Sequence, residues 1–322
     1  MKRMFVMALL APLLLCACAA ARFKEPIGTF DKAVDATVSS TKTLQQKYLE
    51  GNPLISATAT NGQAVCWTVE CATGKTDCRL FQISAAPAKP VAGIEGVTCQ
   101  GIDLNSLAEP SDGDKEILDV LKNVDEYANG LAKLAAADSA GDLDKAIGSL
   151  DNSLKALGES AKFDQDFSPF TAIINFVGGT YLEWRRNKAM KVAIESADPA
   201  IQAMPSLVGE KLVSRYRDAL IQEASRKVTV TKIQYDRQRA ARNPKSDVDA
   251  ALRIETLHEL SDRVAALQTV KKLNTQELFA KMAKAHYELL QTARSSDIDI
   301  SFDALKEFAS SAKDTYESVQ KI

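Results

Sequence analysis

Apolar positions recur at steps of three and four along most of the chain, which is the pattern of amphipathic helices. The first stripe runs from Ile27 to Tyr48, and the sequence Gly51-Asn52-Pro53 predicts the end of that helix. Two further stripes occupy residues 121–135 and 143–161. Because only the short sequence 137–142 connects them, we expect two antiparallel neighbours.

Capping residues predict where the next helices begin. Ser168-Pro169 supplies an N-cap and a first-turn proline for a helix to about Ser196, and Asp198-Pro199 repeats the device for the helix after it. The uncharged run Phe167–Leu182 spans this first start. We expect it to form a helix buried at the bundle centre, and the alternative is a membrane-inserting segment.

The two longest predicted helices cover residues 200–242 and 247–294. The turn sequence at 243–247 leaves room only for an antiparallel hairpin between them. A last helix starts near Ser301. The apolar seam of the second long helix consists of Leu257, Leu260, Val264, Leu267, Leu278, Met282, Ala285 and Leu289.

Residues 54–111 break the helical pattern. Alternating apolar and polar positions at Ala64–Glu70 and Cys78–Ser84, around a turn-rich sequence, predict a β-hairpin. The fold class is therefore mainly α: an elongated antiparallel bundle of long helices, with a small disulfide-linked β-hairpin excursion. An insertion of this length in a compact protein is usually functional or disordered, and crosslinks argue against disorder.

The N-terminus has the pattern of a secretory signal peptide, with the basic Met1-Lys2-Arg3 before the uncharged Met4–Leu15. Leu15-Cys16-Ala17-Cys18 resembles a bacterial lipobox. The resemblance to bacterial lipoproteins implies that Cys18 becomes the acylated first residue. Because Ala19 lacks the aspartate typical of inner-membrane retention, the resemblance also implies a lipid anchor in the outer membrane.

Another cleavage route stays open. Cleavage at Ala17-Cys18-Ala19 or Ala19-Ala20-Ala21 would remove both leader cysteines and release a soluble periplasmic protein. With the lipobox, the chain divides into a signal peptide (1–17), a lipidated tether (18–26), a helical bundle (27–50 and 112–322) and a hairpin module (51–111).

Four cysteines remain in the hairpin module, at positions 66, 71, 78 and 99. An even number of cysteines in an exported chain is typical of disulfides, and we expect the pairs Cys71–Cys78 and Cys66–Cys99. A zinc site is the alternative, but the spacing lacks paired C-x2-C knuckles and no histidine lies nearby.

No catalytic constellation stands out. The two histidines, His258 and His286, lie 28 residues apart on one predicted helix and are expected to flank its seam. At 1.5 Å per residue they are about 42 Å apart, too far to share a metal or a proton. There is no G-x-S-x-G elbow. We therefore expect no enzyme, no cofactor and no metal, and the net charge of −2 does not favour nucleic acid as a partner.

Basic residues gather toward the tip of the long hairpin. Between Lys211 and Lys245 there are 10 basic and 3 acidic residues, which could contact lipid head groups, lipopolysaccharide or an acidic partner. A solvated charged face is the alternative. The candidate partner surface consists of Lys75, Arg79, Arg237, Arg239, Arg242 and Lys245.

These features favour a non-enzymatic lipoprotein, anchored in the outer membrane and facing the periplasm or the surface, that acts as an interaction or scaffold protein. Its partners would be the membrane, through the N-terminal lipid, and another envelope protein. Homo-oligomers stay open, because a long apolar seam serves both intra- and intermolecular packing. The alternatives are a carrier or sensor of a lipid or apolar ligand, a membrane-active helical protein, and an unrecognised envelope hydrolase.

Overall fold

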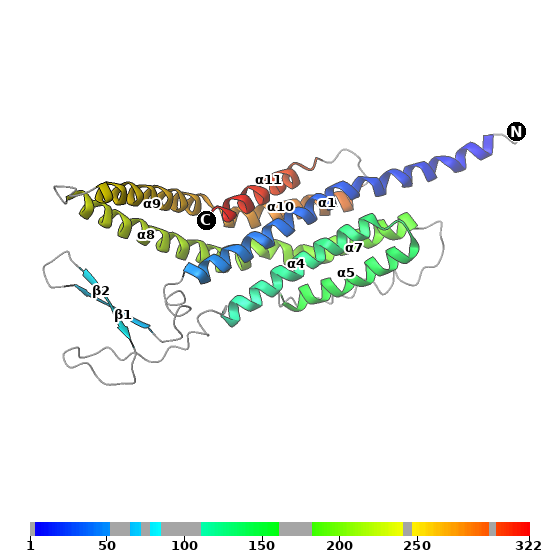
Figure 1. The fold of residues 1–322 in the computed structure, drawn as a ribbon. Coiled ribbons are helices and arrows are strands. Elements are labelled where there is room, and N and C mark those ends of the chain that lie inside the picture. The colour runs from blue at the N-terminus through cyan, green and yellow to red at the C-terminus, as the bar shows by residue number, and fades with distance from the viewer. Residues whose placement is uncertain are drawn as a thin grey trace.

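A computed structural model describes the backbone of residues 4–51, 65–71, 78–84, 111–160, 182–240, 247–295 and 301–322, and side chains from 23 to 49 and from 111 onward, except 161–181, 241–249 and 296–300. The described helices form an elongated, antiparallel bundle, as predicted (Figure 1). They are α1 (Met4–Gly51), α4 (Asp112–Ala136), α5 (Ala140–Ser160), α7 (Leu182–Met204), the π-helix η2 (Pro205–Val213), α8 (Ser214–Ala240), α9 (Asp247–Lys272), α10 (Thr275–Arg294) and α11 (Asp303–Gln320).

Helix α1 runs along the length of the bundle and packs against both α4 and α11. Its predicted stripe is buried at Phe30, Val34, Val38 and Leu44, and the helix ends at Gly51 as predicted. The buried Thr37 hydroxyl donates to a carbonyl one turn earlier, at 2.8 Å. Such a bond satisfies a polar group that would otherwise be costly to bury.

The predicted antiparallel pair is α4 and α5, which pack along their length. Ser111 caps α4, because its hydroxyl accepts from the amide of Asp114 at 3.2 Å. Gly130 lets the helices approach closely: an added Cβ would lie 3.1 Å from Cδ1 of Leu150. The sequence pattern and the short connection were therefore sufficient to predict this part of the bundle.

The predicted helix start at Asp198-Pro199 is wrong, because Pro199 lies inside α7. Proline removes one backbone hydrogen bond from a helix, which favours a break. Here Ala197, Ala200 and Ile201 are all fully buried, so packing holds the helix together across that defect. The helix continues through η2 into α8, and Pro205 marks the change to the wider π-helical turn.

The predicted continuous helix over 247–294 is also wrong. Helix α9 ends at Lys272 and α10 begins at Thr275. Between them Asn274 is the N-cap of α10, since its side chain accepts from the amide of Glu277 at 3.3 Å. Asparagine offers the backbone this local alternative to continuing a helix.

Two short strands lie in the excursion, β1 (Val65–Cys71) and β2 (Cys78–Ser84). They pair antiparallel, with Cys71 opposite Cys78 and Cys66 opposite Ile83. Their side chains and the surrounding loops lie outside the described residues. Both disulfides, and partner roles for Lys75 and Arg79, therefore stay predictions.

Two other predictions also fall outside the described side chains: acylation of Cys18 and burial of the apolar run at 167–181. Among the helices that the structure does describe, none is both long and apolar enough to span a membrane.

Candidate functional site

A buried polar cluster joins three helices in the bundle. His286 on α10 is fully buried, and its Nδ1 lies 3.1 Å from Oδ1 of Asp198 on α7. Its Nε2 lies 2.9 Å from the hydroxyl of Tyr127 on α4. Because a carboxylate only accepts, Nδ1–H donates to Asp198, and the Tyr127 hydroxyl then donates to Nε2. All the hydrogen-bonding capacity of a neutral imidazole is thereby used.

The surroundings of this cluster are apolar and aromatic. The Phe30 ring lies 5.8 Å from the imidazole, and burial raises the pKa of Tyr127 well above its ordinary value, with the charge of Asp198 adding to the effect. Burial also acts to raise the pKa of Asp198, but hydrogen bonds from His286 and Gln202 outweigh it and hold that pKa below its ordinary value. The cluster positions α4, α7 and α10 relative to one another, which corrects the prediction that His286 merely flanks the seam.

The described part of the chain contains no candidate metal-binding site. No group of three His, Cys, Asp or Glu residues there is close enough to hold a metal ion. His258 and His286 lie on different helices, α9 and α10.

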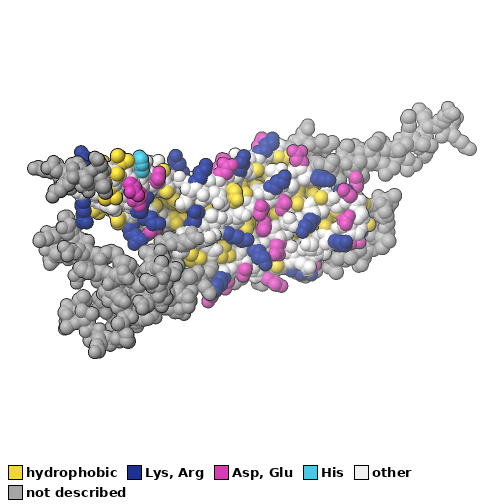
Figure 2. Space-filling view, viewed as in Figure 1, with side chains coloured by type: hydrophobic (Ala, Val, Ile, Leu, Met, Phe, Trp, Pro, Cys, Tyr) yellow, Lys and Arg dark blue, Asp and Glu magenta, His cyan; other side chains and the backbone are white. Residues whose placement is uncertain are grey.

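The most exposed apolar surface lies on a two-helix arm, which we define as residues 221–240 of α8 and 247–269 of α9. Continuous burial along α8 ends at Leu220, and beyond it the two helices pack chiefly on each other. The arm extends past the end of the bundle (Figure 1), and apolar side chains are visible among charged ones on it (Figure 2). Of the eight large apolar side chains exposed in the described residues, five belong to the arm: Val230, Ile233, Leu252, Ile254 and Leu257.

The arm also carries part of the predicted basic surface. Arg237 and Arg239 are exposed in the last turns of α8, near the tip. Arg242 and Lys245 lie in the connection outside the described residues. The predicted seam residue Leu257 is 45% exposed, so the seam prediction is wrong there. In the described part of the chain α9 packs chiefly on α8, and this packing leaves Leu257 exposed.

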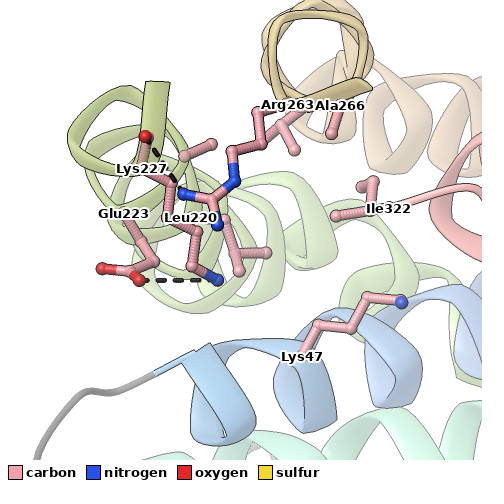
Figure 3. A pocket seen from close by; sticks show the side chains of 9 residues that line it. Lys47, Leu220, Glu223, Lys227, Arg263, Ala266 and Ile322 are labelled. Carbon is pink, nitrogen blue, oxygen red and sulfur yellow. Dashed lines mark hydrogen bonds and ion pairs between the residues drawn. The ribbon is translucent and has the colours of Figure 1, made fainter. Parts of the chain in front are cut away.

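A cleft of about 220 Å³ opens at the base of the arm (Figure 3). Apolar side chains from α8 and α9, together with Ile322, form part of its wall, and charged side chains surround them. The lining residues are Lys47, Leu220, Glu223, Ala224, Lys227, Arg263, Ala266, Val270 and Ile322.

The charges around the cleft are unequal. Glu223 is its one lining carboxylate side chain and already pairs with Arg226 at 2.5 Å and Lys227 at 3.5 Å. Arg263 donates to the carbonyl of Lys227 at 3.2 Å (Figure 3). Lys47 has no ion-pair partner among the described residues. Lys227 and Arg263 thus already have carboxylate partners in Glu223 and Glu259, and Lys47 is the lining cation that can meet an anionic group attached to an apolar tail.

Comparison with known proteins finds no matching family model, no similar characterised protein and no similar solved structure. Function is therefore inferred from geometry alone.

Sequence reasoning missed the polar cluster and the cleft. The cluster brings together residues separated by up to 159 positions, and nothing in their local spacing shows that their helices meet. The break between α9 and α10 had a local signal, since Asn274-x-x-Glu277 has the spacing of a capping box.

Proposed function

We propose that this chain is a non-enzymatic interaction protein of the bacterial envelope, held at the outer membrane by acylated Cys18. The observation that carries the proposal is the arm, with its five exposed large apolar side chains. Large exposed apolar side chains that recur at helical spacing on neighbouring helices favour an interaction site. In the polar cluster Tyr127 and His286 are fully buried and Asp198 is 21% exposed, which favours a structural role for the cluster over a catalytic one.

The positions of α1 and the arm at opposite ends of the protein support this interaction role. Helix α1 begins at the end of the elongated body opposite the C-terminal end of α8 (Figure 1). A lipid on Cys18 would therefore fix one end of the body at the membrane and present the arm away from it. Three acyl chains exceed the single chain that gives only reversible membrane binding.

The anchor and the arm are tested separately in cells. Labelled palmitate should be incorporated into the wild-type protein and not into Cys18→Ser, whereas an unmodified N-terminus at Arg22 would contradict the anchor.

For the arm, in-cell crosslinking should give discrete adducts that disappear in the double variant Ile254→Ser/Leu257→Ser. The matched control is Tyr316→Ser, because Tyr316 is 39% exposed on the bundle helix α11. Adducts that persist in the arm variant would contradict the interaction role.

A second candidate function is favoured by the cleft at the base of the arm. Its cationic rim and apolar wall suit a single-chain anionic amphiphile, in agreement with a carrier or sensor role. Isothermal titration with dodecanoate should show binding that Lys47→Glu weakens at least tenfold and that Lys145→Glu, an exposed change on α5, leaves intact. Equal binding of dodecyltrimethylammonium would contradict it, because a cationic head group should be repelled.

A further inference from the structure

The two helices of the arm carry opposite charges. Within the arm, residues 221–240 of α8 contain five basic and two acidic residues, a net charge of +3. Residues 247–269 of α9 contain two basic and five acidic residues, a net charge of −3 with His258 neutral. The arm is therefore positive along one helix and negative along the other, although its total charge is close to zero.

Several of these charges are not used within the arm. Ion pairs of the arm each lie within a single helix: Arg226–Glu223, Lys227–Glu223, Lys232–Asp236 and Arg263–Glu259. Arg237 on α8, and Glu255 and Asp262 on α9, are exposed and have no ion-pair partner in the part of the chain that the structure describes. These charges remain available to a partner.

The exposed apolar residues form stripes at helical spacing. On α8, positions 226, 230, 233 and 237 read Arg-Val-Ile-Arg, all exposed and separated by four, three and four residues. On α9 a stripe without any charge lies on the exposed side of the helix, away from the buried Thr256 and Val270. This stripe consists of Ala250, Ile254, Leu257, Ser261, Ala265 and Gln268.

An uncharged stripe on the outer side of a charged helix is the pattern of a helix seam that awaits another helix. Glu255 and Asp262 border one side of it, and Arg253 borders the other. On α8 the apolar pair is instead bracketed by arginines. The acidic border of the α9 stripe is thus opposite in sign to the arginines of the α8 stripe.

We propose that the arm docks on the arm of a second copy of this chain, with α8 of each copy beside α9 of the other. The docked arms form a four-helix bundle in which Val230 and Ile233 face Ile254 and Leu257. This inference names the partner of the arm and so rests on the proposed interaction role of that surface, but not on acylation of Cys18.

Charge decides between a second copy and other occupants. An anionic membrane or an acidic protein would attract α8 and repel α9, and a basic partner would do the reverse. A second copy offers both signs in the required arrangement, because each arm carries +3 beside −3. It also covers the exposed apolar residues of both helices at once.

The test is a charge exchange in the full chain, read as co-purification of two differently tagged copies expressed together. Wild-type copies should co-purify. The variants Arg226→Glu/Arg237→Glu and Glu255→Lys/Asp262→Lys should each lose self-association at least tenfold, because like charges then face each other. Co-expression of the first variant with the second should restore the pairing, since opposite charges again meet at both contacts. Circular dichroism of each variant shows that the helices are intact.

If the two variants pair with each other but neither pairs with itself, misfolding cannot explain the result, because misfolded chains would not pair in the mixture either. Two variants that self-associate as well as the wild type, or a mixed combination that fails to pair, would overturn the proposal. Binding to phosphatidylglycerol vesicles that is lost in the α8 variant and kept in the α9 variant would identify a membrane as the occupant instead. If in-cell adducts depend on Ile254 and Leu257 while wild-type copies never co-purify, the interaction role stands and self-docking is wrong.

Discussion

The bundle and the arm are built from helices with similar sequence periodicity, yet they bury their apolar residues to very different extents. On α10, Leu289 is fully buried, whereas on α9 Leu257 is 45% exposed. The difference lies in what surrounds each helix: α10 packs against α7, η2 and α11, and α9 packs chiefly against α8. Periodicity therefore shows which residues could face a partner helix, and the fold decides whether that partner belongs to the same chain.

The largest expected effect comes from truncating the same residue type in both regions. Leu289→Ala should lower the free energy of unfolding by roughly 2–5 kcal/mol, because it leaves a cavity in a close-packed interior. Leu257→Ala should change it by less than about 0.5 kcal/mol in the monomer, since its side chain is already half in water. Urea denaturation at low protein concentration measures both. Equal losses for the two variants would show that the arm is packed like the bundle.

The next effect concerns the buried polar cluster. Tyr127→Phe keeps the ring but leaves Nε2 of His286 without its donor, so it should cost about 1–3 kcal/mol. Tyr287→Phe is the matched control, because Tyr287 is 50% exposed on the same helix as His286. A near-zero effect of Tyr127→Phe in urea denaturation would mean that water reaches the imidazole.

The boundary between arm and bundle gives a smaller effect. Asn274→Ala removes the cap of α10 and should cost about 1 kcal/mol, while Asn274→Asp keeps a capping oxygen and should cost less. Thermal unfolding followed by circular dichroism distinguishes these outcomes. If alanine and aspartate prove equivalent, the helix break depends on packing of Leu273 rather than on the cap.

Sequence alone was sufficient for the parts of the fold that are settled by local pattern. The stripe of α1 and the α4–α5 pair follow from spacing and a short connection. The passage of α7 through Pro199 could not be predicted, because burial of the neighbouring residues outweighs proline's preference. The exposure of Leu257 could not be predicted for the opposite reason. Its spacing is that of a core residue, but among the described helices α9 packs chiefly on α8, which leaves Leu257 at the surface. From the sequence, the apolar positions of the arm are therefore predicted to be a buried seam. The structure instead shows them at the surface, where they form a candidate interaction site.

The smallest effect depends on pH and compares carboxylates in the two regions. Burial, together with the nearby charge of Asp35, raises the pKa of Asp125 in α4 above its ordinary value of 3.8, and the charge of Lys42 only partly opposes this. Asp31 and Glu126 add to the increase. A carboxyl whose pKa is raised on folding disfavours the folded state once it is ionised, so the cost is complete above the raised pKa and absent below 3.8.

Asp125→Asn should therefore raise Tm at pH 7, with a gain of a few tenths of a kcal/mol because solvent screens a half-exposed group. The gain should shrink as the pH falls and vanish below pH 3.8, where the wild-type carboxyl is protonated in both states. Asp262→Asn on the exposed side of the arm is the control and, at protein concentrations low enough to keep the chain monomeric, should leave Tm unchanged at pH 7 and at pH 3. If Asp125→Asn still raises Tm at pH 3, the cause is a hydrogen bond of the new amide and not the removal of a charge. The proposed electrostatic difference between the bundle and the arm would then be wrong.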